Sequence, residues 1–421
     1  MRRSAPKDDI PGGDPGGDVS ELTTDLTTID RAGQVLARQG EHCRAMSAHL
    51  EAHGSLQGSL GLVLLGLQPY ADAALGVGRV VTSTLARVCD TTAYTASTTF
   101  SAYVTADESA FERLRRLGGD LDAGWGGAAA PVTTSPIGPA ESGAPASWGS
   151  TDSYPWEAVG STQQSVVELI DSARGLLGDV QSWGGAGGPV AESVDAQSYL
   201  VTPVASENVM QDLRWSAGLL LGSVDWVFEQ LVGYSMLEEL IFKPFAGDPR
   251  GVEKAAQAWT NVSGALQAVA QNHAHLVSTT VTGWSGAAAD AFRGSMAAIA
   301  AGLLKVAPLF DAVATAMGAV GLLIKGVCAG IGYGLRKLSQ LLIEIAAELA
   351  VPGVGWGVLL ATAYWKIESI FSIVRLVWNL IDSLFDAIAS FADAQAQAVA
   401  GLAIIEDLAE GVFRRAGAAV S

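Results

Sequence analysis

The sequence predicts an all-α fold in which two coiled-coil-like helical-hairpin modules are joined by a flexible linker rich in Gly, Ala, Pro and Ser. Apolar residues recur at alternating steps of three and four over long stretches, which is the spacing of one helix face. Gly and Ala are abundant between the bulky residues, which suits helices that pack closely. A chain of 421 residues is also long enough for two or three domains with their own cores.

Residues 1–20 are rich in Pro, Gly and Asp, and we expect a disordered tail there. Residues 21–117 are predicted to form the first hairpin, with a break between His53 and Pro69 and a second helix from about Tyr70. Small residues on the first arm allow close helix approach, although each glycine costs about 1 kcal/mol of helix stability. The apolar face of this arm consists of Leu22, Leu26, Ile29, Gly33, Leu36, Gly40, Cys43, Ser47 and Leu50.

Residues 118–160 consist mainly of Gly, Ala, Pro, Ser and Thr, and they are predicted to form the flexible linker. A helical connector is expected over 161–249. Its helical patterns cover 161–182 and 206–242, and glycines and a proline separate them.

Residues 250–332 are predicted to form a second hairpin, and 333–421 to form further apolar helices. On the second arm of this hairpin, eleven consecutive positions alternate in steps of four and three, which indicates a long coiled-coil-like helix that Pro308 should kink. These positions are Phe292, Met296, Ile299, Leu303, Val306, Phe310, Val313, Met317, Val320, Ile324 and Val327.

Trp284-Ser285-Gly286 lies between the two arms of the second hairpin. Gly286 permits a turn without a side-chain clash, and Trp284 can hold the helix ends together with its large apolar surface. A Trp-x-Gly turn between amphipathic helices resembles the WXG family, the hairpin substrates of actinobacterial ESX, or type VII, secretion. The resemblance implies that Trp284 and Gly286 form the turn of a non-enzymatic secretion substrate that acts through helix–helix contacts.

Tyr103 and Asp107 form an i, i+4 pair late on the second helix of the first hairpin. The pair resembles the Tyr-x-x-x-Asp/Glu export signal of ESX substrates, which implies contact with the type VII machinery or a chaperone. The ordinary alternative is a solvated helix pair that contributes about 0.3 kcal/mol. Two weaker candidates have the same spacing, Tyr234 with Glu238 and Tyr364 with Glu368.

In the family, the export signal usually works with a Trp-x-Gly turn in the same hairpin or in a partner. Here Tyr103 and Trp284 lie in different predicted hairpins, so two options are open. The hairpins pack on each other as an internal pair, or each recruits a separate helical-hairpin partner or a second copy of the chain.

The net charge of −18 argues against a nucleic-acid-binding surface and opposes attraction to anionic lipid. The first residues lack the apolar segment of a signal peptide. The ESX resemblance therefore implies a secreted or cell-envelope-associated protein without a cleaved signal peptide.

Two alternatives to this function stay open. The apolar excess allows membrane association, and a membrane-active or pore-forming protein would insert residues 296–390. Pro308, Asp311 and a Pro- and Gly-interrupted stretch after Leu349 favour buried core helices instead. The second alternative is the carrier module of a secreted toxin system, although the chain ends in helical sequence without a new globular composition.

The sequence contains no His-Glu-x-x-His, Gly-x-Ser-x-Gly or Gly-Lys-Ser/Thr phosphate-loop signature, so we predict no catalytic residue, cofactor or metal. His42, His49 and His53 share one helix, and surface histidines are the preferred interpretation over a zinc pair. His273 is interpreted as a hydrogen-bonded core histidine, with a pH-sensitive hairpin as the alternative.

The three cysteines, Cys43, Cys89 and Cys328, are too widely spaced to define a disulfide framework or a metal motif. Buried small apolar residues are the preferred interpretation. A bridge between Cys43 and Cys89 across the first hairpin is the alternative.

Overall fold

The computed structural model describes residues 25–118, 135–149, 188–205 and 247–350, together with isolated residues elsewhere. This part of the chain contains four α-helices, which are α1 (Leu26–His53), α2 (Gln68–Gly118), α7 (Pro249–Thr279) and α8 (Ala287–Ala350). Two 3-10 turns, η1 (Leu62–Leu67) and η4 (Ala196–Tyr199), accompany them. Within the described ranges the chain has isolated β-bridges but no strand, so the all-α prediction is confirmed there.

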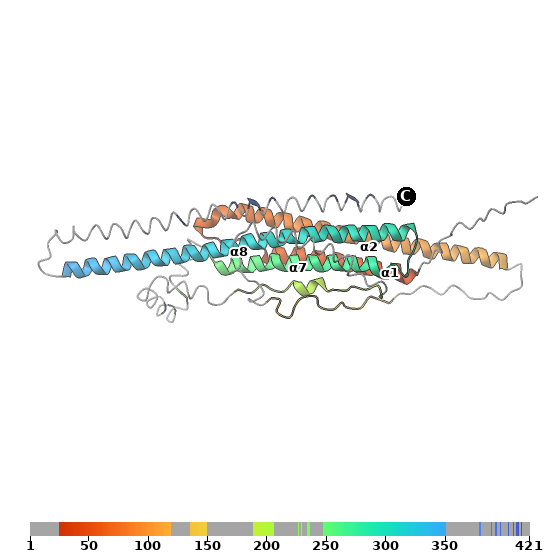
Figure 1. The fold of residues 1–421 in the computed structure, drawn as a ribbon, viewed down its shortest axis with the longest axis horizontal. Coiled ribbons are helices and arrows are strands. Elements are labelled where there is room, and N and C mark those ends of the chain that lie inside the picture. The colour runs from red at the N-terminus through yellow and green to blue at the C-terminus, as the bar shows by residue number, and fades with distance from the viewer. Residues whose placement is uncertain are drawn as a thin grey trace, which may run out of the picture.

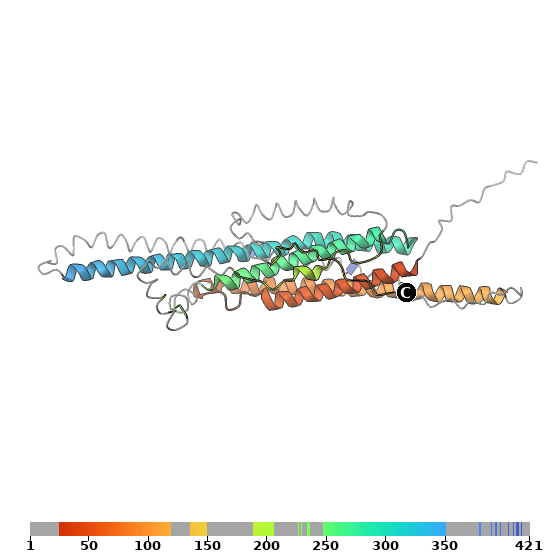
Figure 2. The ribbon, with the colours of Figure 1, turned by 90° about the horizontal axis from the view of Figure 1, so that it is seen from below.

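The four helices run side by side along the long axis of the molecule (Figures 1 and 2). α1 packs mainly against α2, α7 packs mainly against α8, and α1 also contacts α7. The connection between α1 and α2 meets the start of α7 through a bridge between Leu60 and Gly247. At the opposite end, the Asp25 amide donates to the Gly283 carbonyl at 2.6 Å, which joins the start of α1 to the α7–α8 turn. Adjacent helices are therefore antiparallel, and the two connections lie at opposite ends.

Local sequence explains where α1 and α7 begin. The Asp25 carboxylate accepts a hydrogen bond from the Thr27 amide, and Asp248 does the same for the Arg250 amide. An aspartate at this position satisfies amide groups that have no partner within the helix. Pro249 occupies the first position of α7, where a missing N–H costs nothing.

One apolar core contains buried residues of all four helices. Its largest member is Trp259 of α7, which is 1% exposed and donates from Nε1 to the Gly54 carbonyl at the end of α1. Its ring lies 5.4 Å from that of Phe310 on α8. A Cβ atom at Gly78 of α2 would lie 2.7 Å from the same indole, so the close approach of α2 requires glycine there. Trp259 thus contacts the three other helices or their ends.

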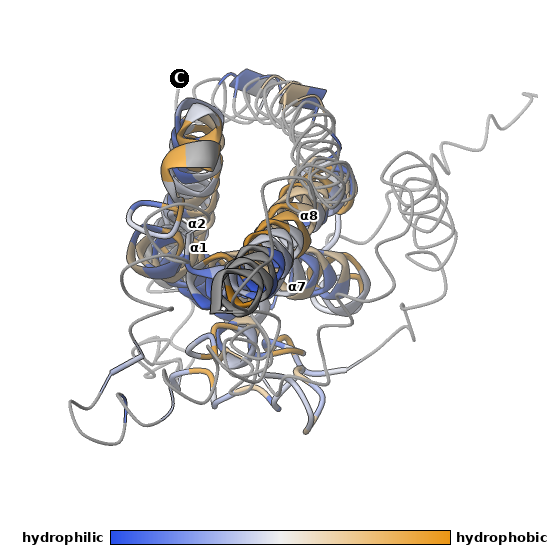
Figure 3. Cartoon of the chain, turned by 90° about the vertical axis from the view of Figure 1, so that its left-hand side faces the viewer, coloured by the Kyte–Doolittle hydropathy of each residue, from blue (hydrophilic) through white to orange (hydrophobic). Residues whose placement is uncertain are grey.

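The apolar face predicted for α8 lies inside this core. Of its eleven positions, ten are buried and Phe292 is partly buried. Hydrophobic residues are prominent on α8 when the bundle is viewed end-on (Figure 3). The predicted boundary between residues 332 and 333 falls inside α8, which continues through both Pro308 and this point. No Gly-Pro cluster interrupts the sequence before Pro352, so the helix has no local reason to end earlier.

Asp311 is a carboxylic acid on the otherwise apolar part of α8. It is partly buried, and Ser263 Oγ of α7 lies 2.7 Å from its Oδ2. Burial raises the pKa of Asp311 to about 7, despite the opposing hydrogen bond from Ser263. The side chain therefore holds its proton in the folded state at a pH where the unfolded chain has lost it.

The Asp311→Asn variant should become more stable relative to wild type as the pH rises from about 4 to about 7. A pKa raised on folding gives stability that is fully present below the unfolded pKa and is lost as the pH rises through the folded pKa. The difference should grow by up to about 1.4 kcal/mol per pH unit, because the neutral amide does not ionise. Urea unfolding of both proteins across this pH range measures it, and a constant difference would contradict the buried-acid assignment.

Candidate functional site

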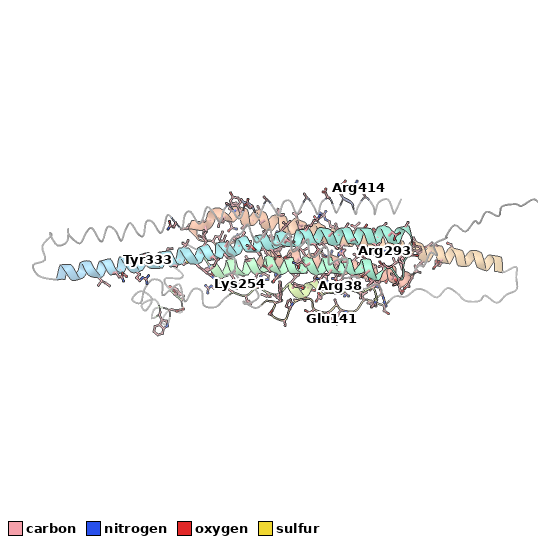
Figure 4. All side chains as sticks on the ribbon, in the orientation of Figure 1. Arg38, Glu141, Lys254, Arg293, Tyr333 and Arg414 are labelled. Carbon is pink, nitrogen blue, oxygen red and sulfur yellow. The ribbon has the colours of Figure 1, made fainter. Side chains whose placement is uncertain are left out.

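The connection between α7 and α8 contains the Trp-x-Gly motif. Gly286 has a φ of 98°, a conformation that glycine adopts without strain, and α8 begins at the next residue. The Gly286 carbonyl accepts from the Asp290 amide at 3.0 Å, and the Trp284 carbonyl accepts from Arg293 Nη1 at 2.9 Å. Arg293 lies at this end of the bundle in Figure 4. The first turn of α8 is thus bonded back onto the motif.

The Trp284 side chain is 2% exposed and closes the turn end of the bundle. Its ring lies 5.2 Å from the ring of Phe292 on α8. It forms a small apolar cluster with Ile29 of α1 and Ala289 of α8, separate from the main core. Because Ile29 belongs to the first helix pair, Trp284 joins the two pairs as well as the arms of its own turn.

Tyr103 packs against this same cluster, together with Phe100 of α2. The first residue of the predicted export pair is therefore brought to the Trp-x-Gly turn, although the two lie far apart in sequence. Asp107, one helical turn further along α2, is exposed. We call the face of α2 that carries Phe100, Tyr103 and Asp107 and lies over the Trp284 cluster the turn-end surface.

The turn-end surface lies where α2 leaves the other helices. α2 extends beyond the α7–α8 turn at this end, as α8 extends beyond the bundle at the other (Figure 1). Residues Ser101 to Ser109 of α2 are mostly exposed and include Asp107 and Glu108. This geometry presents a half-buried aromatic ring and a free carboxylate side by side, which suits recognition by another protein.

Neither of the two weaker export candidates is seen on a helix in the part of the chain that the structure describes. Tyr234 lies in a bend, and Ser235 is also non-helical. The helix that was expected to run from Tyr234 to Glu238 is therefore not formed at its first two residues. Glu238, Tyr364 and Glu368 lie outside the described residues.

A second site, which is polar and buried, was not predicted from the sequence. Residues 135–149 and 188–205 form a layer across α1 and α7, on the side of the bundle where Arg38 and Glu141 lie in Figure 4. Glu192 of this layer has a side chain that is 2% exposed. Its carboxylate accepts hydrogen bonds from Arg38 Nη1 and Gln39 Nε2, both at 3.0 Å, and His42 Nε2 lies 2.6 Å from it. Burial opposes ionisation, but these bonds, that of His42 foremost, hold the pKa of Glu192 below its ordinary value.

Amide side chains of α7 bind the backbone of the same layer. Asn272 Oδ1 accepts from the Ser193 and Val194 amides, and its Nδ2 donates to the Val194 carbonyl. Further along, Asn261 Nδ2 donates to the Val201 carbonyl and Gln257 Oε1 accepts from the Val204 amide. The segment 188–205 is thus held on α7 by hydrogen bonds between amide side chains of the helix and backbone groups of the segment.

This site explains one wrong prediction. His42 was expected at the surface, but it is 6% exposed because Glu192 covers it. The sequence carried a weak signal, since Gln39 and Asn272 directly precede Gly40 and His273, which belong to the predicted apolar faces. Polar amides beside a buried face require partners, but the partner segment could not be identified from the pattern.

His273 is a hydrogen-bonded core residue, as predicted. It is 0% exposed, and its Nδ1 lies 2.8 Å from the Val269 carbonyl. The rings of His49 and His53 lie 5.0 Å apart, and burial lowers the pKa of His49 to about 4, with His53 adding to the effect. Among the described residues, no three His, Cys, Asp or Glu side chains converge as a metal site.

A cavity of about 310 Å³ lies beside the turn, between the start of α1, the α7–α8 turn and residues 188–190. Its lining offers the hydroxyls of several threonines, the Arg31 guanidinium and the Asp25 carboxylate, which already caps α1. No protein-family model, curated protein or solved structure matches the chain.

Proposed function

We propose that this protein is a non-enzymatic substrate of type VII (ESX) secretion that acts through helix–helix contacts at or outside the cell envelope. The Trp-x-Gly turn and the Tyr103–Asp107 pair are the sequence features that support the proposal. On this proposal the protein leaves the cell without a cleaved signal peptide, and its partner is the secretion machinery or a chaperone.

The observation that carries the proposal is the packing of Tyr103 against the Trp284 cluster. In the family that the motifs resemble, the export pair works alongside a Trp-x-Gly turn in the same hairpin or in a partner. Here the two come from different helix pairs and lie together at one end, with Asp107 exposed beside them.

The helix contacts favour an internal pair over two separate partners. α1 and α2 would form one hairpin module and α7 and α8 the other, each burying its apolar face against its neighbour. Residues of all four helices share one core, and α1 contacts α7, so the two modules already bury apolar residues against each other. On this proposal, 118–160 acts as the connection that allows the pairing within one chain.

The export test uses Asp107→Ala and Tyr103→Ala in an actinobacterium that secretes the protein. Both variants should stay in the cell pellet, because the surface that the machinery binds would be altered. Protein in the medium and in the pellet is compared by immunoblot, with a cytoplasmic protein as a lysis marker. Undiminished export of both variants would overturn the proposal for this signal.

Two matched controls separate recognition from folding. Glu108→Ala removes another exposed carboxylate from the next position of α2 and should be exported. Tyr94→Ala removes a tyrosine that is 68% exposed and lies away from the turn-end surface, and it should also be exported. Loss of export in all four variants would indicate a general folding defect and would contradict the specific role of Tyr103 and Asp107.

Membrane insertion is the second candidate function, and one observation favours it. The stretch Ala287–Lys337 of α8 is long and apolar enough to cross a membrane, but most of its most apolar part is buried in the bundle. Insertion would require this buried face to leave α7. Dye release from anionic and neutral liposomes, measured with the purified protein over a wide pH range, tests this candidate, and an absence of leakage would exclude it.

A further inference from the structure

Two of the three cysteines lie together in the core. Cys43 of α1 is 0% exposed and Cys89 of α2 is 1% exposed. They lie on facing turns of the two helices, because the residues that follow them, Arg44 and Asp90, form an ion pair at 2.7 Å. Cys328 is also buried, but on α8. All three are free thiols in this structure.

α1 and α2 pack closely where the two cysteines face each other. Helix axes ordinarily lie 8–10 Å apart, whereas a disulfide requires Cα atoms about 4.4–6.8 Å apart. Small residues bring these helices closer near the cysteines. A Cβ atom at Gly40 would clash with the Asp90 carboxylate and would lie 3.5 Å from the Ala86 carbonyl. Gly40, one turn before Cys43, thus leaves room for α2 to approach α1.

A histidine stands beside the pair. Cys89 Sγ lies 3.9 Å from His273 Nε2 of α7. His273 Nδ1 faces the Val269 carbonyl at 2.8 Å, so Nδ1 carries the proton and Nε2 is left as an acceptor toward the thiol. The neighbouring Cys43 thiol and burial raise the pKa of Cys89, which keeps this thiol protonated while the core stays closed.

We propose that Cys43 and Cys89 are a redox pair that forms a disulfide between α1 and α2 when the protein folds in an oxidising compartment. The oxidant is a small-molecule disulfide such as oxidised glutathione. The thiolate of one cysteine attacks a sulfur of the oxidant, and one glutathione thiolate leaves. The second cysteine thiolate attacks the mixed disulfide and releases the other glutathione thiolate. The cysteines lose two electrons, the oxidant disulfide gains two, and the two thiol protons pass to the glutathione thiolates.

Burial determines when the bond can form. The closed core excludes glutathione, so the exchange takes place before α1 and α2 pack or while they open. The bond would close the chain segment from Cys43 to Cys89 into a loop. Because a closed loop restricts the unfolded chain, the bond would stabilise the folded helix pair. This inference stands whether or not the protein is a secretion substrate.

The test refolds the reduced full-length protein from denaturant in buffer with excess oxidised glutathione. Free thiols are then alkylated in denaturant and located by peptide mass spectrometry. We expect two of the three cysteines to escape alkylation, a mass lower by two hydrogens, and one linked peptide pair containing Cys43 and Cys89. Three alkylated or separately glutathionylated cysteines, or a linkage through Cys328, would overturn the proposal.

Two cysteine variants test whether the disulfide links Cys43 to Cys89. Cys328→Ser should keep the linkage, and Cys43→Ser should lose it. Oxidised wild type should also unfold at a higher denaturant concentration than the reduced form, and reductant should reverse this shift. If Cys43→Ser fails to fold, the wild-type peptide map and the Cys328→Ser control still decide the question.

Discussion

Replacement of Trp259 by alanine is expected to lower the free energy of unfolding by about 3–5 kcal/mol. The indole is 1% exposed and lies between Gly78 of α2 and Phe310 of α8. The substitution would leave a cavity where the helices meet, and it would remove the hydrogen bond from Nε1 to the Gly54 carbonyl. A loss of this size is a large fraction of the stability of an ordinary domain.

Urea unfolding followed by circular dichroism measures this loss. Trp226→Ala is the matched control, because it removes the same side chain from a position that is 49% exposed. The control should change the free energy of unfolding by less than about 1 kcal/mol. Equal effects of the two substitutions would contradict the central position of Trp259.

Replacement of Glu192 by alanine is expected to cost about 3–5 kcal/mol, because it removes the carboxylate that pairs with Arg38 and His42. His42 would be left in a buried site without this acceptor, and Gln39 Nε2 would keep only its longer bond to the Val35 carbonyl. The effect should also depend on pH. Since folding lowers the pKa of Glu192 from its ordinary 4.5, its contribution is fully present above that pH and is lost as the pH falls through the folded pKa.

Glu141→Ala is the control for Glu192→Ala. Glu141 lies in the same layer and its side chain is exposed, while its backbone carbonyl still accepts from the Asp195 amide in the variant. Hydrogen exchange of residues 188–205 reports whether the layer has detached from α1 and α7. Equal protection of this segment in wild type and Glu192→Ala would show that the carboxylate does not hold it.

The helices were predictable because each is encoded by neighbouring residues. The alternation from Met296 to Val327 repeats with the helix period, and that period requires only local backbone geometry. The break after His53 and the start of the next helix near Pro69 were visible for the same reason. The boundary placed at residue 332 was wrong because no residue there stops a helix.

The polar layer was not predictable in the same way. Glu192, Arg38 and Asn272 come from three separate segments, and no periodic pattern relates them. Apart from Glu192, residues 188–205 bind α7 largely through backbone groups, which every residue carries and which leave little trace in side-chain composition. His42 was therefore assigned to the surface, although a distant carboxylate buries it.

The sequence by itself determined which faces of the helices are apolar, because side chains three and four positions apart share a face whatever surrounds them. It also marked Trp284-Ser285-Gly286 as a candidate turn. Only the tertiary structure decided which faces meet. The approach of α1 to α7 and α2 places Tyr103 on the Trp284 cluster, Glu192 on His42, and Cys43 beside Cys89. Those contacts join residues far apart in the chain, so they depend on the packing of whole helices rather than on any local pattern.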